Sequence, residues 1–315
     1  MIITVTLNPA VDRVIVLHEL RVGDSNRVTD GQIDPGGKGV NVSRVLREMG
    51  AESLATGFVA GSLGKFIEES LKQQGIRTAF IRSSGQTRQN LAIVETCCAR
   101  HTLLNEVGPV TSPRFFERLQ DQLRRQIRRG DWVVLAGSVP PHLPATVYAD
   151  LIRLTHLVGG KACLDTDGAP LLEGIRARPD LVKPNREELS RLVGRRLFTE
   201  DSVLQAAQQL HRQCVGMVVV SLGQQGSIAV DAEGVWCAVP PAVETVSAIG
   251  AGDSLVAGLV LAMSRGEYLA DGLRLGTAAG AATALQPGTR LARAADIQCL
   301  LPEVILDPMY VAAAA

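Results

Sequence analysis

The spacing of hydrophobic residues predicts alternating strands and helices, most clearly in the second half of the chain. Short apolar runs predict strands at Met1–Leu7, Trp132–Ala136, Lys161–Asp165, Leu181–Lys183 and Met217–Leu222. Helical spacing follows at Ala145–Val158, Glu187–Val193, Ser202–Cys214 and Ser254–Met263. Repeated strand-then-helix units indicate parallel strands joined by right-handed crossovers, hence an open, doubly wound α/β sheet. Ligands of such sheets bind at the carboxyl ends of the strands.

Two stretches break this rhythm, namely Pro9–Pro35 and Gln89–Pro109, which resemble short strands with polar turns. They could form a small β-sheet lid over a pocket, and ordinary long loops explain them as well. We find no repeat, no low-complexity linker and no domain boundary. We therefore expect one domain over residues 1–315, with lid strands inserted at about 9–35 and 89–109. The tail Ala312–Ala315 is expected to fray.

Composition narrows the function classes. Of the 315 residues, 46% are hydrophobic, enough for a substantial core. The formal net charge is zero, which argues against a nucleic-acid partner because such proteins carry a basic surplus. The first residues read as a strand and not as a signal peptide, and no apolar run is long enough to cross a bilayer. We expect a cytoplasmic protein without a membrane partner.

The cysteines suggest the same compartment. There are six of them, at positions Cys97, Cys98, Cys163, Cys214, Cys237 and Cys299. None forms a C-x-x-C pair, and none lies near a histidine at zinc-finger spacing. They are expected to be buried, small apolar residues in a reducing compartment.

The first chemical motif is Gly250-Ala251-Gly252-Asp253, directly before an apolar helix. Its glycines allow a tight turn whose N–H groups, together with the helix dipole, make an anion site. Such donors would stabilise the charge on a transferring phosphoryl group, and Asp253 could accept the proton of an attacking hydroxyl. A helix-capping aspartate after a glycine turn explains the same residues.

The second motif is Pro35-Gly36-Gly37-Lys38-Gly39-Val40-Asn41, at the start of a helix that runs to Met49. A dinucleotide fingerprint fails at Val42, where a glycine is needed, and a P-loop fails at Gly39, where Ser or Thr is needed. Bare backbone, one cation and one amide remain, which suit a polyhydroxylated, anionic small molecule. A glycine-rich turn with a solvated lysine is the competing interpretation.

Arg88, in Thr87-Arg88-Gln89-Asn90, offers a planar fork suited to phosphate oxygens. Arg27 and Lys38 are further cations that could converge on the same phosphate. An ordinary surface arginine is the alternative for Arg88.

Asn185 and Glu188 lie three residues apart at a predicted helix start, in Lys183-Pro184-Asn185-Arg186-Glu187-Glu188. Their oxygens suit Mg²⁺, usually through water, because Mg²⁺ keeps several waters in proteins. A capped helix after a strand explains the same residues.

Two glycine-containing segments follow later in the chain. Ser221-Leu222-Gly223-Gln224-Gln225-Gly226 would let a ligand approach the backbone at a strand end, or would simply turn a hairpin into Ser227–Asp231. The small residues of Thr277–Ala284 would admit a flat ring beside a helix, or would serve tight helix–sheet packing.

The order of these motifs is more specific than any one of them. The chain carries Asn8-Pro-Ala-Val-Asp12, Gly-Gly-Lys-Gly-x-Asn, Thr-Arg-x-Asn, Gly137-Ser138-Val-Pro-Pro141, Lys-Pro-Asn-x-x-Glu, Ser-Leu-Gly-x-x-Gly and Gly-Ala-Gly-Asp. Over roughly residues 1–300 it resembles the PfkB branch of the ribokinase-like sugar kinases, in particular the phosphofructokinases and tagatose-6-phosphate kinases. The resemblance implies an α/β domain with a β-sheet lid, lids that pair into a homodimer, and transfer of phosphate from ATP to a sugar phosphate with Mg²⁺.

Carried over motif by motif, the resemblance implies Asp253 as the catalytic base and Gly250, Ala251 and Gly252 as the anion hole. The implied substrate contacts are Asp12, Arg27, Gly36, Gly37, Lys38, Asn41, Arg88, Asn90 and Ser138. The implied ATP contacts are Lys183, Asn185, Ser221, Gly223 and Gly226, with Asn185 and Glu188 placing Mg²⁺ through water. Relatives often have Thr-Val before Gly-Ala-Gly-Asp, where this chain has Ala248-Ile249, so a hydroxyl contact near the nucleotide is in doubt.

The segments that separate substrates within this family point in two directions. Gly-Gly-Lys-Gly and Leu104-Asn-Glu-Val-Gly-Pro109 resemble 1-phosphofructokinases and tagatose-6-phosphate kinases. Pro287-Gly-Thr-Arg-Leu291 and Thr-Arg-Gln-Asn resemble PfkB-type 6-phosphofructokinases. Fructose 1-phosphate is the favoured substrate, with fructose 6-phosphate and tagatose 6-phosphate as alternatives. A non-catalytic sugar-phosphate sensor and a nicotinamide dehydrogenase are rivals of other classes, disfavoured by Asp253 and by Val42.

Overall fold

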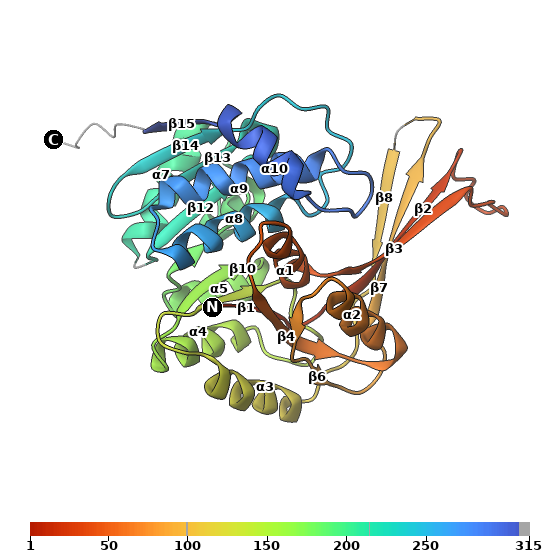
Figure 1. Cartoon of the computed structure of the whole chain (residues 1–315), viewed down its shortest axis with the longest axis horizontal. Coiled ribbons are helices and arrows are strands. Elements are labelled where there is room, and N and C mark those ends of the chain that lie inside the picture. Colours follow the sequence, from red (N-terminus) through yellow and green to blue (C-terminus); the bar gives the residue numbers. More distant parts are fainter. Residues whose placement is uncertain (99, 214, 309–315) are drawn as a thin grey trace.

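The computed structural model describes residues 1–98, 100–213 and 215–308, and shows a central sheet between two helical layers with a smaller sheet to one side (Figure 1). The strands of the central sheet are β1 (Ile2–Thr6), β4 (Ser53–Val59), β5 (Arg77–Thr78), β6 (Ile81–Arg82), β9 (Trp132–Ala136), β10 (Lys161–Asp165), β11 (Leu181–Val182), β12 (Met217–Ser221), β13 (Ser227–Val230), β14 (Val235–Val239) and β15 (Ile305–Pro308). The helices are α1 (Lys38–Glu48), α2 (Gly61–Gln73), α3 (Pro113–Gln126), α4 (Val147–Leu157), α5 (Gly168–Arg176), α6 (Arg186–Val193), α7 (Glu200–Arg212), α8 (Ala251–Arg265), α9 (Leu269–Ala284) and α10 (Ala294–Leu300), with short 3₁₀ turns at Gly223–Gln225 and Leu301–Glu303.

The central sheet has the strand order β15-β14-β13-β12-β11-β10-β9-β1-β4-β5, and β6 also pairs with β4. The strands from β4 through β1, β9, β10 and β11 to β12 are all parallel, whereas β13, β14 and β15 add an antiparallel edge. This confirms the doubly wound, mostly parallel sheet predicted from the sequence. Its parallel strands all end at the same edge, where a ligand site is expected.

The short apolar runs become strands because both faces of the sheet are buried. In β9, Val133 and Leu135 pack into the core under α3 to α7, while Trp132, Val134 and Ala136 face the core under α1, α8, α9 and α10. Successive side chains of a strand point to opposite faces, so a strand between two helical layers must be apolar at every position. The run therefore shows no alternation in the sequence.

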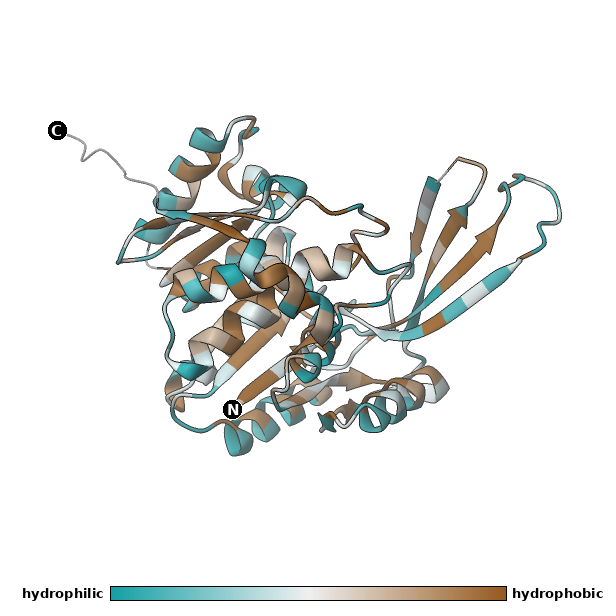
Figure 2. Cartoon of the chain, turned by 45° about the horizontal axis from the view of Figure 1, so that its top comes forward, coloured by the Kyte–Doolittle hydropathy of each residue, from teal (hydrophilic) through white to brown (hydrophobic). Residues whose placement is uncertain are grey.

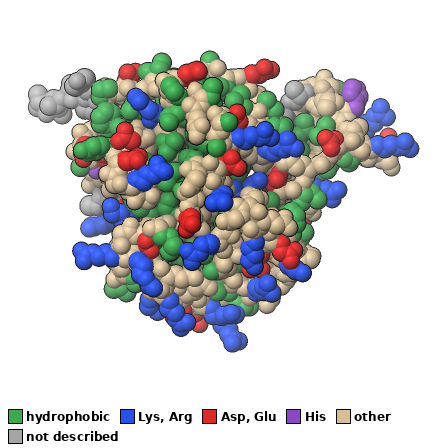
Figure 3. All heavy atoms as spheres, in the orientation of Figure 1, with side chains coloured by type: hydrophobic (Ala, Val, Ile, Leu, Met, Phe, Trp, Pro, Cys, Tyr) green, Lys and Arg blue, Asp and Glu red, His purple; other side chains and the backbone are tan. Residues whose placement is uncertain are grey.

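The stretches that break the strand–helix rhythm form the second sheet. It consists of β2 (Ala10–Leu17), β3 (Asp30–Gly36), β7 (Arg88–Glu95) and β8 (Arg100–Asn105), in the order β3-β2-β7-β8. β2 pairs antiparallel with β3 and parallel with β7, and β7 pairs antiparallel with β8. We call this sheet the lid, and it stands out from the body of the molecule (Figures 1 and 3).

Element boundaries shift slightly from the sequence prediction. Ala145–Val158 is shorter at both ends as α4, and Glu187–Val193 gains one residue as α6 because Asn185 caps that helix. Ser202–Cys214 begins two residues earlier as α7 because Thr199, and not a later residue, forms the cap. Cys214 and the tail Ala312–Ala315 lie outside the described residues.

The prediction of buried cysteines is wrong for most of those described. Cys163 is buried and Cys237 is half-buried, but Cys97, Cys98 and Cys299 are exposed. Cys97 and Cys98 lie in the turn after β7, where no core element covers them. None of the described helices is both long and apolar enough to cross a membrane.

The small residues near the end of α9 serve close packing between helices. A Cβ added to Gly258 of α8 would lie 2.4 Å from the Cα of Gly276 in α9, so the two backbones touch without side chains between them. Within the Thr277–Ala284 run, a Cβ on Gly280 would lie 3.2 Å from the carbonyl oxygen of Ala251 in α8. The small residues of the run thus pack closely against a helix, whereas the packing interpretation of the sequence named only the sheet. Thr277 also reaches Ser227 of β13, with 3.2 Å between their hydroxyl oxygens.

Candidate active site

The start of α8 presents unpaired N–H groups. Gly250 is the N-cap in a left-handed conformation with φ of 81°, and a Cβ there would meet Leu291 at 2.5 Å, so glycine is required. In the described part of the chain, the N–H groups of Gly252 and Asp253 have no hydrogen-bond acceptor. Free N–H groups at the positive end of a helix dipole form an anion site.

Asp253 does not cap this helix, contrary to the simplest interpretation of the motif. It lies in the first turn of α8, is 7% exposed, and its Oδ2 accepts a hydrogen bond of 2.8 Å from the Nδ2 of Asn41 in α1. Burial, followed by the nearby charge of Asp165, raises the pKa of Asp253 to about 7. A carboxyl group with this pKa can both accept and hold a proton near neutral pH.

Two lysines and an aspartate form a buried cluster beside this carboxylate. Oδ1 of Asp165 lies 3.0 Å from Nζ of Lys38 and 3.4 Å from Nζ of Lys183, and its side chain is fully buried. Burial alone would raise the pKa of Asp165, but the charges of Lys183 and Lys38 hold it below its ordinary value. Lys38 is thus ion-paired, and the interpretation of a solvated lysine in a glycine turn is wrong.

The same cluster acts on Lys38. Burial alone would lower its pKa, but the carboxylates of Asp165, Asp253 and Glu188 outweigh burial and raise it. Lys38 therefore keeps its positive charge at neutral pH. A Cβ built on Gly252 would lie 3.6 Å from Nζ of Lys183, so this second ammonium group lies directly beside the N-terminus of α8.

Asn185 and Glu188 form a capping box at the start of α6. Oδ1 of Asn185 accepts from the N–H of Glu188 at 2.8 Å, and Oε2 of Glu188 accepts from the N–H of Asn185 at 2.8 Å. This confirms the capped helix, yet the cap uses only one carboxylate oxygen. Oε1 of Glu188 lies 4.0 Å from Nζ of Lys38 and faces the buried cluster.

Asp12 and Asn90 pair across the lid strands β2 and β7. Nδ2 of Asn90 donates to Oδ1 of Asp12 at 2.8 Å, and a Cβ on Gly36 would overlap the other oxygen of Asp12. Burial raises the pKa of Asp12, and the hydrogen bond from Asn90 opposes that effect. Gly37, with φ of 106°, lets β3 turn directly into α1, which joins this polar pair to the lysine cluster.

Arg88 begins β7 and braces the base of the lid. Its Nε donates to the carbonyl of Asn8 at 3.2 Å and its NH1 to the carbonyl of Glu106 at 2.9 Å, so it is not a free surface arginine. A hollow of about 640 Å³ opens beside it, lined by Glu106, Gly108 and Phe115 among others. Ser138 is exposed nearby and accepts from Nδ2 of Asn8 at 3.1 Å.

Arg27 is not brought to this site within one chain. It is exposed in the connection between β2 and β3, beyond the paired residues Val16 and Asp30. The strand pair runs from there back to Ala10 and Gly36, which at about 3.3 Å per residue is roughly 20 Å. Arg27 and Arg88 therefore cannot hold one phosphate together in a single chain.

The segment Ser221–Gly226 makes a hairpin between β12 and β13, as the simpler interpretation predicted. Gly223 and Gly226 both have positive φ, at 64° and 96°, and a Cβ on Gly226 would meet the carbonyl oxygen of Ala238 at 2.0 Å. Ser221 forms an isolated bridge with Asn185. The hairpin thus borders the strand end that carries Lys183 and Asn185.

Two features of the site have no motif in the sequence. Asp165 was not predicted, although it is the last residue of a predicted parallel strand, the position where ligands of such sheets bind. The second is an ion pair between α1 and β3, in which NH2 of Arg44 lies 3.4 Å from Oδ1 of Asp34. Oδ2 of Asp34 also accepts a hydrogen bond of 2.7 Å from Oγ1 of Thr289. Tertiary contact alone brings these residues together.

The site thus combines free N–H groups at a helix start, a buried carboxylate and two ammonium groups at the carboxyl edge of a parallel sheet, with a polar lid adjoining it. This arrangement defines a kinase of the ribokinase-like fold. Residues 5–295 match the model of the pfkB family carbohydrate kinase, and the chain belongs to that family.

Individual relatives match this chain over most of its length. A 1-phosphofructokinase of Bacillus subtilis is 36% identical over 304 residues, covering 96% of this chain and 98% of the relative. A tagatose-6-phosphate kinase of Staphylococcus epidermidis is 35% identical, covering 82% and 84%. The structure of phosphofructokinase-2 from Escherichia coli in complex with substrates and products has a TM-score of 0.92 at 32% identity, covering 96% of this chain and 98% of that chain.

Proposed function

We propose that the chain uses ATP to phosphorylate fructose 1-phosphate, giving fructose 1,6-bisphosphate. The family and the relatives that are named 1-phosphofructokinase support this reaction. The single observation that carries the proposed phosphoryl transfer is the buried Asp253, whose pKa is raised to about 7, at the start of a helix with free N–H groups. We further propose that residues 1–315 act as one domain.

In the proposed mechanism Asp253 accepts the proton of the attacking hydroxyl. The hydrogen bond from Asn41 fixes the orientation of the carboxylate. The N–H groups of Gly252 and Asp253 would bind the oxygens of the transferred phosphoryl group, and Lys183 and Lys38 add positive charge close by. Because these groups are already in place, little reorganisation is needed as charge develops.

Glu188 fits a Mg²⁺ ion better than Asn185 does. The oxygen of Asn185 is used by the helix cap, whereas Oε1 of Glu188 is outside it. Oδ2 of Asp165 is buried with no hydrogen-bond partner in the described part of the chain, a second oxygen of the kind that Mg²⁺ prefers. Mg²⁺ with ATP would neutralise phosphate charge, and Lys183, Ser221, Gly223 and Gly226 would border the nucleotide.

The sugar would lie between the lid and the cluster. We propose that Asp12 and Asn41, with Gly37, bind its hydroxyls and that Arg88 binds its phosphate. Among the described residues Lys38 forms ion pairs with Asp165 and Glu188 and none with the lid, so we assign it to the transferred phosphoryl group. The sequence analysis placed both Lys38 and Arg88 on the sugar's phosphate, whereas we now propose that they bind two different phosphate groups.

We propose a homodimer through the lid. Hydrophobic residues continue from the core strands into the lid strands (Figure 2), and Ile33, Leu103 and Leu104 are each more than half exposed, at 52%, 52% and 54%. Arg27 could then reach a sugar phosphate only from the lid of the second copy. Thiols without disulfides among the described cysteines support a reducing, cytoplasmic location.

The test is ADP formation, measured with a coupled assay, for fructose 1-phosphate, fructose 6-phosphate, tagatose 6-phosphate and unphosphorylated fructose. We expect the highest kcat/KM with fructose 1-phosphate and the lowest with fructose, which lacks the group for Arg88. A preference for fructose 6-phosphate or tagatose 6-phosphate would change the assigned substrate but would leave the proposed phosphoryl transfer in place. Binding of sugar phosphate without ADP formation would indicate the sensor and end the kinase proposal.

A further inference from the structure

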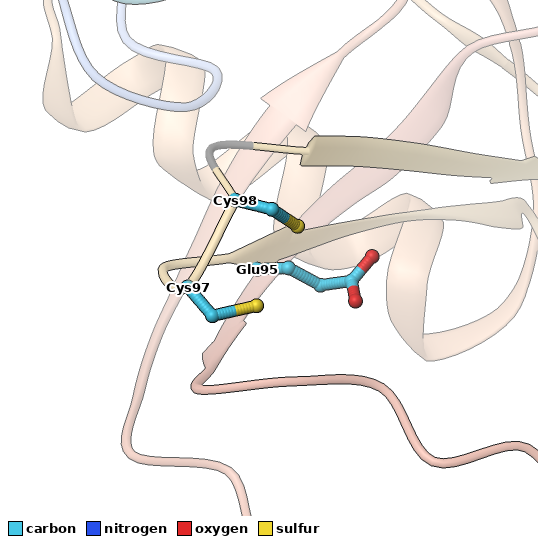
Figure 4. A group of neighbouring side chains, drawn as sticks. All are labelled: Glu95, Cys97 and Cys98. Carbon is cyan, nitrogen blue, oxygen red and sulfur yellow. The ribbon is translucent and has the colours of Figure 1, made fainter.

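The far end of the lid holds a group of metal-ligating side chains that the proposed reaction does not use. Glu95 ends β7, and Cys97 and Cys98 lie in the turn that follows (Figure 4). One carboxylate oxygen and the two sulfur atoms all lie within 4.8 Å of one another, and both sulfurs point to the side of the turn that holds the carboxylate.

The carboxylate of this group is held in place before any ion arrives. The side chain of Glu95 is 3% exposed, and its Oε1 accepts from the N–H of Leu20 at 3.1 Å. The N–H of Cys97 donates to the carbonyl of His18 at 3.0 Å, which fixes the turn against the end of β2. The donors are thus positioned by hydrogen bonds between the turn after β7 and the connection that follows β2.

A positive group already contacts two of these three donors. Nε of Arg100 lies 3.3 Å from Oε2 of Glu95, and its NH2 lies 3.4 Å from Sγ of Cys98. The hydrogen bond from Arg100 lowers the pKa of the Cys98 thiol, while the bond between the two thiols raises that of Cys97. Since the Arg100 side chain is 65% exposed, it can turn outward into water, and the buried carboxylate of Glu95 is then left in need of another cation.

We propose that Glu95, Cys97 and Cys98 form a binding site for a thiophilic divalent cation of the Zn²⁺ class, which replaces the guanidinium of Arg100. Two thiolates and one carboxylate oxygen are ligands that Zn²⁺ accepts, with water in the fourth position. Tetrahedral ligands at Zn–S distances near 2.3 Å lie roughly 3.7 Å apart, so donors within 4.8 Å of one another need to close by at most about one ångström. Binding releases the two thiol protons to solvent.

The site is separate from the proposed active site. Glu95 pairs with Leu17 at one end of the lid, and Arg88 pairs with Ala10 at the other. Seven steps along β7 at about 3.3 Å each place roughly 23 Å between them. Oε1 of Glu95 keeps its bond to Leu20, so the ion would join the β7–β8 turn to the connection that carries Arg27.

Cadmium titration of the full chain under a phosphine reductant tests this, because cadmium thiolates absorb in the ultraviolet. We expect one Cd²⁺ per chain bound by two thiolates, with Zn²⁺ displacing it. The double variant Cys97→Ser/Cys98→Ser should bind at least about tenfold more weakly, since loss of a supporting group alone costs 10–100-fold. Cys299→Ser, which removes another exposed thiol, should bind as the unaltered chain does.

Unchanged affinity in the double variant, or an equal loss in Cys299→Ser, would overturn the proposal. Both altered cysteines are exposed, so the double variant should fold, and its thermal unfolding checks this. Arg100→Ala gives an independent readout, because removal of the competing cation should tighten Cd²⁺ binding several-fold. Equal or weaker binding in that variant would show that the guanidinium does not hold the place of the metal.

Discussion

The lysine cluster at the sheet edge and the lid contain similar polar groups but differ in how their charges are compensated and in how much apolar surface they expose. In the cluster the charges compensate one another in a buried setting, with Asp165 fully buried and the side chain of Lys183 4% exposed. Among the described residues the lid, like the cluster at Oδ2 of Asp165, holds a buried oxygen without a hydrogen-bond partner, Oδ1 of Asn90, but the lid also exposes apolar side chains such as Leu104. The cluster is prepared for chemistry, whereas the lid is prepared for a ligand or a second copy.

This difference predicts that changes in the cluster act on kcat and changes in the lid act on KM. The largest effect is expected for Asp253→Asn, which keeps the shape and the contact with Asn41 but cannot take a proton. Loss of general base catalysis should lower kcat by about 10²–10⁴-fold. Steady-state ADP formation measures kcat, and calorimetry should show that sugar phosphate still binds.

Near-normal kcat in Asp253→Asn would remove Asp253 from the mechanism and with it the contrast between the two regions. Asp201→Asn is the matched control, because Asp201 lies in the first turn of a helix as Asp253 does, but is exposed at the start of α7. It should leave kcat unchanged.

The next effect concerns the stability of the cluster. Asp165→Ala leaves the ammonium group of Lys183 buried without its partner, a change that typically costs 3–5 kcal/mol. Urea unfolding should show this loss. Asp150→Ala is the control, because its pair with Arg153 is exposed on α4 and should cost below about 1 kcal/mol. Equal losses of unfolding free energy in both variants would show that the buried cluster contributes no more to stability than an exposed ion pair does.

The lid is tested through Arg88→Ala. Loss of one charge-assisted contact to the sugar's phosphate, about 1.5–3 kcal/mol, should raise KM for the sugar phosphate by roughly 10–100-fold. KM for ATP should stay the same. Arg13→Ala, an exposed arginine on the neighbouring strand β2, serves as the control. A parallel rise in both KM values would mean that Arg88 only braces the carbonyl groups of Asn8 and Glu106.

The sequence predicted the central sheet well because burial on both faces leaves continuous apolar runs such as Trp132–Ala136. It also singled out Asp253, Lys38 and Asn41, since the glycines around them mark places where backbone must turn tightly. Asp165 carries no such mark. Its importance comes from Lys38 and Lys183, which tertiary folding brings to the same oxygen. No local sequence pattern predicts that Asp165, Lys38 and Lys183 come together.

Single-residue roles were harder to predict where one residue serves two purposes. Asn185 and Glu188 are a helix cap, and the cap leaves one oxygen of Glu188 directed at the cluster. Arg27 lies eight residues before Pro35, but the distance along the chain does not reveal that β2 and β3 extend away from the body. Spacing identifies a candidate, whereas the register of the strands decides which end of the lid it occupies.

The smallest predicted effect is on stability, and it follows from the chemistry of the cluster. The folded pKa of Asp253, about 7, is above its ordinary value of 3.8, so burial opposes the charged form. Below the ordinary pKa both states are protonated and this residue costs nothing. As pH rises from the ordinary pKa to the folded pKa, the unfolded chain loses its proton first and the fold loses stability relative to it, and this loss is complete above the folded pKa.

Asp253→Asn removes that cost, so the variant should be more stable than the unaltered chain by a few kcal/mol at neutral pH and above, since each unit of raised pKa corresponds to about 1.4 kcal/mol. The gain should shrink toward zero as the pH falls to about 4, and urea unfolding across this range measures it. A gap that stays constant with pH would mean that Asp253 is charged at no cost in the fold. In that case the base would not be tuned by burial, and the contrast between a prepared cluster and an incomplete lid would have to rest on Asp165 alone.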